Sequence, residues 1–211
     1  MQKRLVRKLD LEMAISAVAT HPSPKVYLEQ YTVTPEVAAE ILYMATYIYN
    51  DISGKTVVDL GCGTGRLAIA AALLDAKEVV GVDIDKTAVM QAIENAEKLG
   101  VKAKIEWIIA DIDAVRGSFD TVLQNPPYGV QKRNADRKFL EKAISIGRRV
   151  YSLHKAVNTR FLKAFIEKNG GEIRAVHTFS MGIPRMFGFH RQQKHQFLVD
   201  LYVIEQKTLL K

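Results

Sequence analysis

The sequence Asn125-Pro126-Pro127-Tyr128, which follows the apolar run at 120–124, joins a side-chain amide, a rigid backbone and an aromatic ring. Each proline fixes its own φ and restricts the residue before it, so Asn125 and the neighbouring carbonyls can hold fixed acceptor positions. Tyr128 adds a stacking face. Together these groups suit an amine nucleophile on a flat substrate. A turn that only ends a strand is the alternative that the motif alone leaves open.

A glycine-rich turn is the second candidate site. The apolar run at 57–60 leads into Gly61-Cys62-Gly63-Thr64-Gly65, and glycines let a ligand approach the backbone directly. The dinucleotide-binding fingerprint would need a third glycine where this chain has Arg66, and a phosphate loop would need a lysine after Gly65. The turn therefore argues against NAD and against a nucleotide triphosphate.

Acidic residues close the next two apolar runs. Asp83 lies about 20 residues after Gly61, where an acid accepts hydrogen bonds from ribose hydroxyls. Asp111 follows the third run, and its carboxylate could accept from the exocyclic amine of an adenine. Capping of the following helix or turn is the alternative for each acid. The series implies a ribose-containing ligand without phosphate.

The hydrophobic periodicity predicts alternating strands and helices. Thr34 and Pro35 begin a helix that reaches residue 48, and further helices are expected at 66–74, 86–99, 135–146 and 156–168. Strands are expected at 56–60, 78–82, 104–110, 119–124, 150–153, 172–181 and 196–206. The fold class is therefore α/β, with a seven-stranded, mostly parallel sheet, helices on both faces and an antiparallel edge pair.

Length and composition indicate one domain over 1–211, with a helical extension at 1–50 and a core at 51–211. The sequence contains no long uncharged stretch that would indicate a signal peptide or membrane span. The single cysteine, Cys62, excludes an internal disulfide and a thiolate zinc cluster and suits a reducing compartment. We expect a cytoplasmic protein with no membrane partner.

The net charge of +7 is concentrated between residues 129 and 160, where nine basic residues face two acids. Such a segment directly after the motif could recruit a polyanion, although a solvated helix face is the alternative. Candidate phosphate contacts are Lys132, Arg133, Arg137 and Lys138. A second candidate patch contains His190, Arg191, Lys194 and His195, whose histidines could equally be packed or polar edge-strand residues.

The series Asp59-x-Gly61-x-Gly63-x-Gly65, Asp83, Asp111 and the Asn-Pro-Pro-Tyr motif resembles class I S-adenosylmethionine-dependent methyltransferases, which have a Rossmann-like fold, over about 56–130. The resemblance implies S-adenosyl-L-methionine as the cofactor. It places Asp59, Cys62 and the glycines along the methionine moiety, and Asn125 also in the cofactor site. It further assigns the ribose to Asp83, the faces of the adenine to Ile84 and Ile112, and its amine to Asp111.

Two flanking segments are similar to the methyltransferase-like-five family of RNA N6-adenine methyltransferases. They are Leu28-Glu29-Gln30-Tyr31-x-x-Thr34 and Phe187-Gly188-Phe189-His190-Arg191-x-x-Lys194-His195. The resemblance implies that Gln30, Tyr31 and Thr34 fold over the cofactor and that the substrate is RNA, with ribosomal RNA as the expected class. By analogy, a small zinc-containing activator could bind the apolar strand at 79–82 or the edge strands.

The expected chemistry is methyl transfer to an adenine amine, with Asn125, Pro126, Pro127 and Tyr128 as the catalytic motif. The Asn125 oxygen and the Pro126 carbonyl would hold the amine while Tyr128 stacks on the base, and neither a histidine nor a metal is required. Two alternatives remain open. One is a glutamine methyltransferase of the kind that modifies release factors, and the other is a non-catalytic binding subunit with the same fold.

Overall fold

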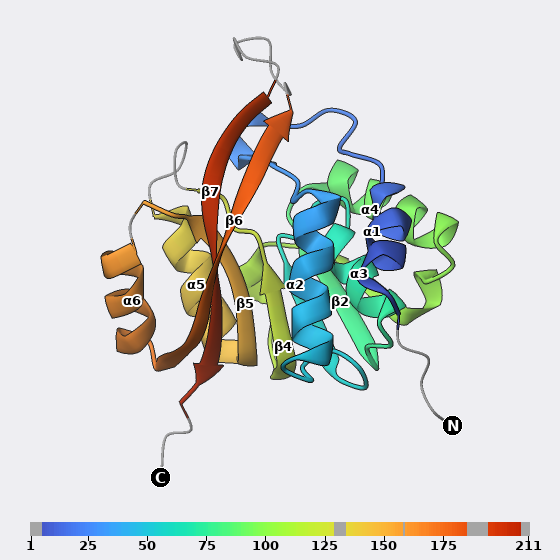
Figure 1. Cartoon of the computed structure of the whole chain (residues 1–211). Coiled ribbons are helices and arrows are strands. Elements are labelled where there is room, and N and C mark those ends of the chain that lie inside the picture. The colour runs from blue at the N-terminus through green and yellow to red at the C-terminus, as the bar shows by residue number, and fades with distance from the viewer. Residues whose placement is uncertain (1–5, 129–133, 158, 185–193, 208–211) are drawn as a thin grey trace.

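The computed structural model describes residues 6–128, 134–157, 159–184 and 194–207. A central sheet is covered by helices on both faces (Figure 1). The strands are β1 (Thr56–Leu60), β2 (Glu78–Asp83), β3 (Ile105–Ile109), β4 (Phe119–Gln124), β5 (Gly147–Lys155), β6 (Gly171–Pro184) and β7 (Lys194–Gln206). The α-helices are α1 (Lys8–Ser16), α2 (Pro35–Tyr47), α3 (Arg66–Leu73), α4 (Lys86–Lys98), α5 (Ala135–Ile146) and α6 (Thr159–Lys168). Short 3-10 turns are η1 (Val26–Leu28), η2 (Lys102–Lys104) and η3 (Ile112–Ala114).

The seven strands have the order β3-β2-β1-β4-β5-β7-β6, and β7 runs antiparallel to both of its neighbours. The predicted α/β class and the antiparallel edge pair are therefore confirmed. The order reverses between β1 and β4, which pair directly, and Leu60 at the end of β1 is in register with Val82 and Gln124. The residues that follow these strands consequently meet at one edge, where open α/β sheets bind ligands.

The two faces of the sheet bury two separate apolar clusters. Alternate residues point to opposite faces, so Val57 packs with α1, α2 and α3 whereas Val58 packs with α5 and α6. Leu11 and Ile41 from the first two helices belong to the same cluster as Val57. The segment 1–50 thus contributes side chains to the core, while its treatment as an extension of one domain stays a prediction.

Most element boundaries agree with the periodicity, and the differences have local causes. Thr34 caps α2 as expected, since its Oγ1 accepts a hydrogen bond from the Val37 amide. Strand β5 is longer than the expected 150–153 because its pairing with β7 extends from Arg149 to Lys155. Helix α6 begins at Thr159 and not at residue 156. None of the described helices is long and apolar enough to cross a membrane.

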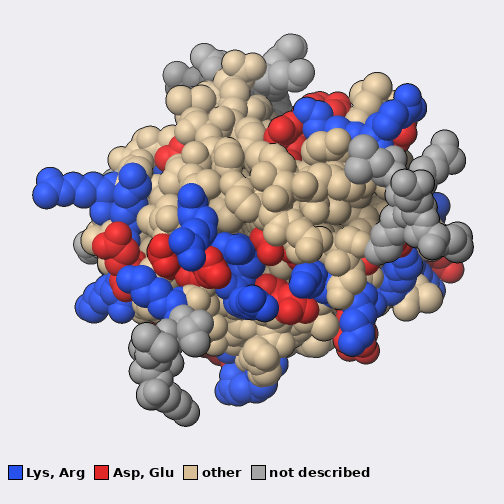
Figure 2. Space-filling model, turned by 60° about the horizontal axis from the view of Figure 1, so that its bottom comes forward, with Lys and Arg blue, Asp and Glu red and all other residues tan. Residues whose placement is uncertain are grey.

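The basic residues that the structure describes between 134 and 160 do not form one surface, because β5 carries some of them to opposite ends of the sheet. Arg149 and Lys155 are six residues apart along this strand, or about 20 Å. The Arg149 guanidinium lies 3.1 Å from Asp51 and 3.2 Å from Glu205, and Glu205 also pairs with Arg174. Figure 2 shows that basic and acidic side chains are interleaved at the amino ends of the parallel strands. Charge counted along the chain therefore overstates the basic surface.

Candidate active site

A cavity of about 270 Å³ lies at the carboxyl ends of the parallel strands. Its floor is the glycine turn after β1, and its sides are the residues that follow β2, β3 and β4. Another side is formed by the start of α5, with Lys138 and Phe139, and the last by the segment between α1 and α2, residues 17–34, which we call the strap. The strap passes over the upper end of the sheet in Figure 1. The cavity thus joins segments that are far apart in the sequence.

The glycine turn has a backbone that side chains would disfavour. Gly61, Gly63 and Gly65 all have positive φ angles, of 69°, 54° and 88°. A Cβ atom on Gly65 would lie 2.6 Å from the Trp107 ring, so this position also needs glycine for space. The amides of Gly61 and Cys62 donate to the Val82 carbonyl at 2.8 and 3.0 Å. The turn is therefore fixed against the end of β2, with the buried Cys62 in the cavity wall.

Two acids, the buried Asp59 and the half-buried Asp83, hold the backbone of the glycine turn and of the helix that follows it. Asp59 is 1% exposed and accepts a hydrogen bond from the Ala68 amide, while burial raises the pKa of its carboxyl to about 7. Asp83 accepts from the Gly63 amide and from the Asp85 amide, each at 2.8 Å, and burial raises its pKa as well. Both acids line the cavity, as the sequence predicted.

The residues expected around an adenine lie together. Ile84 and Ile112 line the cavity beside Asp111. Asp111 also caps η3, because its Oδ1 accepts from the Asp113 amide at 2.9 Å, so the capping role is observed and the contact with an adenine stays a prediction. Lys138 donates to Asp111 at 2.7 Å and pairs with Asp113 at 2.9 Å. Its ammonium group is thus already paired with acids, and its assignment to an RNA phosphate stays a prediction.

The motif residue Asn125 has a defined amide orientation. Its Nδ2 donates to the Tyr31 carbonyl at 2.8 Å, which leaves Oδ1 as the acceptor, 3.4 Å from the Tyr128 hydroxyl. Asn125 and Pro127 line the cavity, whereas Pro126 is buried behind it. Because a carbonyl can only accept, this contact determines which atom of the amide remains available to a substrate amine.

Aromatic and basic side chains surround Tyr128. Its ring is stacked with that of Tyr31, with centroids 6.2 Å apart and an interplanar angle of 17°. Phe197 from β7 makes an edge contact at 5.8 Å, and the Lys155 ammonium lies 5.1 Å from the centre of the Tyr128 ring. The sequence analysis named neither Phe197 nor Lys155, since nothing in their spacing relates them to the motif.

The strap brings two of its three predicted residues to the cavity. Gln30 and Tyr31 line it, and the Gln30 side chain donates to Asp85 at 2.8 Å. The Thr34 hydroxyl instead caps helix α2. The neighbouring strap residues Thr32 and Val33 line the cavity in place of Thr34.

The residues that hold the ends of the strap were not predicted from the sequence. Arg66, buried at the first position of α3, donates to the carbonyls of Val33 and Val18. The Asn95 amide exchanges two hydrogen bonds of 3.1 Å with the backbone of Ala19. The sequence did mark Arg66 as unusual, because dinucleotide-binding enzymes have glycine at this position. Its role could not be predicted, since the carbonyls that it binds are more than 30 residues away in the chain.

The predicted RNA contacts are only partly within the described ranges. Lys132, Arg133, His190 and Arg191 lie outside them. Lys194 and His195 begin β7, but their side chains are also outside the described part of the chain. The Arg137 guanidinium lies 4.2 Å above the Phe161 ring on α6. Among the described residues, no group of three or more His, Cys, Asp or Glu side chains could hold a metal ion.

The residues of the cavity fit S-adenosylmethionine. A sulfonium is a cation, and the carboxylates of Asp59, Asp83 and Asp111 line the cavity. Within the described ranges, the wall contains Arg66, which donates to two backbone carbonyls of the strap, and Lys138, which pairs with Asp111 and Asp113, and these two side chains do not form a phosphate cradle. The charged side chains that line the cavity therefore favour a cationic nucleoside over a dinucleotide.

Comparisons with known proteins agree with this geometry. A family model for ribosomal protein L11 methyltransferase (PrmA) matches residues 28–126. The rRNA N(6)-adenosine-methyltransferase Mettl5 of Drosophila melanogaster is 35% identical over 94% of this chain and 96% of its own. The Danio rerio METTL5 is 34% identical over 90% of this chain and 95% of its own.

A solved structure resembles the whole chain. It is the crystal structure of a candidate RNA methyltransferase, PH1948 from Pyrococcus horikoshii, with 40% identity, a TM-score of 0.89, and coverage of 97% of this chain and 100% of that one. The similarity to the METTL5 proteins extends over at least nine tenths of this chain. This chain therefore belongs to the METTL5 family of rRNA N6-adenosine-methyltransferases.

Proposed function

We propose that this protein transfers a methyl group from S-adenosyl-L-methionine to the N6 amine of an adenine in ribosomal RNA. The observation that carries the proposal is the orientation of Asn125, whose Nδ2 is bound to the Tyr31 carbonyl while Oδ1 is left to accept. An adenine amine has two hydrogens to donate. The named relatives support RNA, and specifically rRNA, as the substrate class.

Binding and positioning supply most of the catalysis in this proposal. The amine lone pair of adenine is delocalised into the ring, which makes it a poor nucleophile. Hydrogen bonds from the amine to Asn125 Oδ1 and the Pro126 carbonyl favour a tetrahedral nitrogen, with Pro127 and Tyr128 holding the base beside the cavity. Fixing the amine in line with the methyl group can contribute up to about 7 to 11 kcal/mol.

The cofactor is assigned to the cavity. When bound there, S-adenosylmethionine supplies an electrophilic methyl group. Asp83 accepts from the ribose hydroxyls, Ile84 and Ile112 contact the adenine faces, and Asp111 accepts from its amine. The glycine turn and Asp59 lie along the methionine moiety, which Gln30 and Tyr31 of the strap cover in this proposal.

RNA binds at the mouth of this cavity. A target base must leave its stack, which requires least energy in single-stranded or loop regions. The aromatic and basic side chains around Tyr128, including Lys155, support contact with an unstacked base and its phosphates. Arg137 extends this surface in the proposal, and Lys132 and Arg133, which lie outside the described ranges, remain predicted phosphate contacts.

A small zinc-containing activator remains part of the proposal. Strand β2 pairs with both β1 and β3, so a contact through residues 79–82 would not add a strand to the sheet, and this contact stays a prediction. The edge strands are β3 and β6, and on β3 the side chains of Ile108 and Ile109 are 42% and 49% exposed. Activity of the isolated chain would show that no partner is obligatory, and would also exclude a purely non-catalytic subunit.

The test incubates the protein and methyl-labelled S-adenosylmethionine with purified rRNA and, in parallel, with ribosomal proteins and release factors. We expect label in RNA, recovered as N6-methyladenosine after digestion to nucleosides, and a single modified position on mapping. The L11 methyltransferase match makes a protein substrate the second candidate. Label found only in ribosomal or release-factor protein would overturn the RNA assignment.

A further inference from the structure

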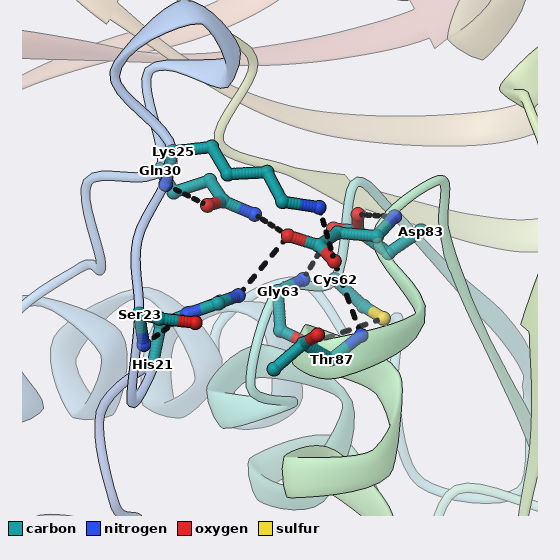
Figure 3. A network of polar contacts seen from close by, with 9 residues as sticks. His21, Ser23, Lys25, Gln30, Cys62, Gly63, Asp83 and Thr87 are labelled. Atoms are coloured by element: carbon teal, nitrogen blue, oxygen red, sulfur yellow. Dashed lines mark hydrogen bonds and ion pairs between the residues drawn. The ribbon is translucent and has the colours of Figure 1, made fainter.

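The centre of the strap rests on one carboxylate that belongs to neither the motif nor the predicted cofactor residues. Asp85, the residue before α4, accepts from the Thr87 amide at 3.1 Å, which is an ordinary helix cap. Three side chains from the strap also converge on it (Figure 3). His21 Nε2 lies 3.1 Å and Gln30 Nε2 2.8 Å from Oδ2, and Lys25 Nζ lies 3.1 Å from Oδ1.

The cluster is buried, so the loss of a contact to its carboxylate would be energetically costly. The side chains of Asp85 and His21 are 1% and 2% exposed. Burial by itself raises the pKa of Asp85, but the hydrogen bonds from Gln30, Lys25, Thr87 and His21 lower it to about 2. The carboxylate is therefore ionised at neutral pH, and a buried charge that loses its donors is strongly unfavourable.

Two of the three strap side chains in this cluster, those of His21 and Gln30, each have a second hydrogen bond. The Ser23 amide donates to His21 Nδ1 at 3.0 Å, so this nitrogen is the acceptor and Nε2 carries the hydrogen that points at Asp85. The Lys25 amide donates to Gln30 Oε1 at 2.7 Å. Two backbone amides of the strap thus depend on side chains that Asp85 holds, while Arg66 and Asn95 hold only its ends.

The same cluster is connected to the catalytic amide. Gln30 is followed by Tyr31, whose carbonyl accepts the Asn125 Nδ2 hydrogen at 2.8 Å. A displacement of Gln30 moves this carbonyl, and the Asn125 amide then loses the contact that distinguishes its oxygen from its nitrogen. One carboxylate on the cofactor side of the cavity is in this way linked to the acceptor on the substrate side.

We propose that Asp85 is a positioning residue that holds the strap over the cofactor cavity and, through Gln30 and Tyr31, sets the orientation of the Asn125 amide. The proposal rests on the proposed function for its cofactor and its catalytic amide. It adds a residue that couples the two halves of the site, and it makes the strap a single unit whose placement is decided at its centre.

The test replaces Asp85 by asparagine, which can still cap α4 but removes the charge and presents an amide to the strap donors. Binding of S-adenosylhomocysteine, measured by calorimetry without RNA, should weaken by about tenfold or more. Amide exchange of Ser23 and Lys25, followed by NMR in the ligand-free protein, should accelerate relative to wild type. At saturating cofactor and RNA, kcat should also fall, because Asn125 is no longer oriented.

Asp120→Asn is the matched control, since Asp120 also accepts from a backbone amide and a hydroxyl, both of Thr56, but lies at the opposite end of the sheet. It should change global stability without altering ligand affinity or Ser23 and Lys25 exchange. Should Asp85→Asn fail to fold, Lys25→Met serves instead, because the Lys25 side chain is 40% exposed. A smaller effect in the same direction is expected.

Unchanged exchange at Ser23 and Lys25 in Asp85→Asn would overturn the proposal, and so would an affinity loss no greater than that of Asp120→Asn. A normal kcat with weakened binding would remove the link to Asn125. These outcomes differ from failure of the proposed function, in which the wild type itself would not methylate RNA. The exchange experiment needs neither RNA nor cofactor and is decisive in either case.

Discussion

Asn125 Nδ2 donates a hydrogen bond of 2.8 Å to the carbonyl oxygen of Tyr31, a residue 94 positions earlier in the chain. The carbonyl has no hydrogen to give, so the amide cannot rotate by half a turn without losing this bond and opposing two oxygens. The contact therefore presents an oxygen, and not an NH2 group, to a substrate amine. It also makes the strap part of the catalytic site.

Asn125→Ala should lower kcat by at least about a hundredfold, as expected when one preorganised transition-state contact is removed. The dissociation constant for S-adenosylhomocysteine should remain close to that of the wild type, because Asp83 and the glycine turn are untouched. Asn125→Asp should also be inactive, since a carboxylate oxygen would face the Tyr31 carbonyl. Single-turnover methylation of rRNA and calorimetry check both variants, and wild-type turnover in either one would contradict the assigned role.

Tyr128→Phe and Tyr128→Ala should separate stacking from hydrogen bonding. The hydroxyl contact with Asn125 is long, at 3.4 Å, so the phenylalanine variant should lose less than about threefold in kcat/KM. The alanine variant removes a stacking face worth about 1 to 3 kcal/mol, which corresponds to roughly 5- to 150-fold. Steady-state kinetics with an rRNA fragment decide this, and equal losses in the two variants would be inconsistent with a stacking role.

Arg137→Gln should weaken RNA binding and reduce its salt dependence. Loss of one phosphate contact lowers the slope of log affinity against log salt by about 0.7 for a single strand. Arg174→Gln is the control, because it makes the same charge change at the amino end of the sheet, where Arg174 pairs with Glu172 and Glu205. Filter binding between low and moderate salt provides the slopes. A similar reduction for both variants would indicate net charge and not a local contact.

Two glycines of the turn should respond differently to alanine. Gly63 has open space around it but a φ of 54°, so Gly63→Ala should cost about 1 kcal/mol in the free energy of unfolding. Gly65→Ala combines a φ of 88° with a Cβ atom 2.6 Å from Trp107, and should cost roughly 2 to 5 kcal/mol. Urea denaturation measures both, and the order of the two losses is the critical result.

His154 should make the protein less stable as the pH falls. Its imidazole is 3% exposed, Nε2 lies 2.7 Å from the Ser152 hydroxyl, and burial lowers its pKa to about 4. The unfolded chain binds this proton near pH 6.5 and the folded one only near 4, so stability is lost as the pH falls through that window. The loss amounts to at most roughly 3 kcal/mol.

Comparison with His154→Gln isolates this contribution, because the raised pKa of Asp59 acts in the opposite sense between about pH 4 and 7 in both proteins. The wild type should lose stability relative to the variant as the pH is lowered from 7 to 4. Chemical denaturation across this range gives the difference, which should be flat above pH 7. A difference independent of pH throughout would show that His154 titrates normally.

Local chemistry accounts for the features that the amino-acid sequence alone predicts. Apolar periodicity is set by backbone geometry, and it located all seven strands and most helices to within a few residues. Glycines with positive φ and acids at strand ends are equally local signals, so Gly61, Asp83 and the motif at 125–128 were identified from their own neighbourhoods. The parallel sheet then requires these strand ends to meet at one edge.

Contacts between side chains that are far apart in the sequence could not be predicted from such local signals. The contacts of Asp85 with His21 and Gln30 and of Arg66 with Val18 and Val33 join residues 33 to 64 positions apart, and the contact of Asn125 with Tyr31 spans a still longer separation. The division of the basic segment between two ends of β5 has the same origin. Which groups face one another depends on strand order, register and the path of the strap, and these follow from packing of the whole chain. The linear pattern thus specifies which chemical groups the site contains, while packing determines how they are oriented.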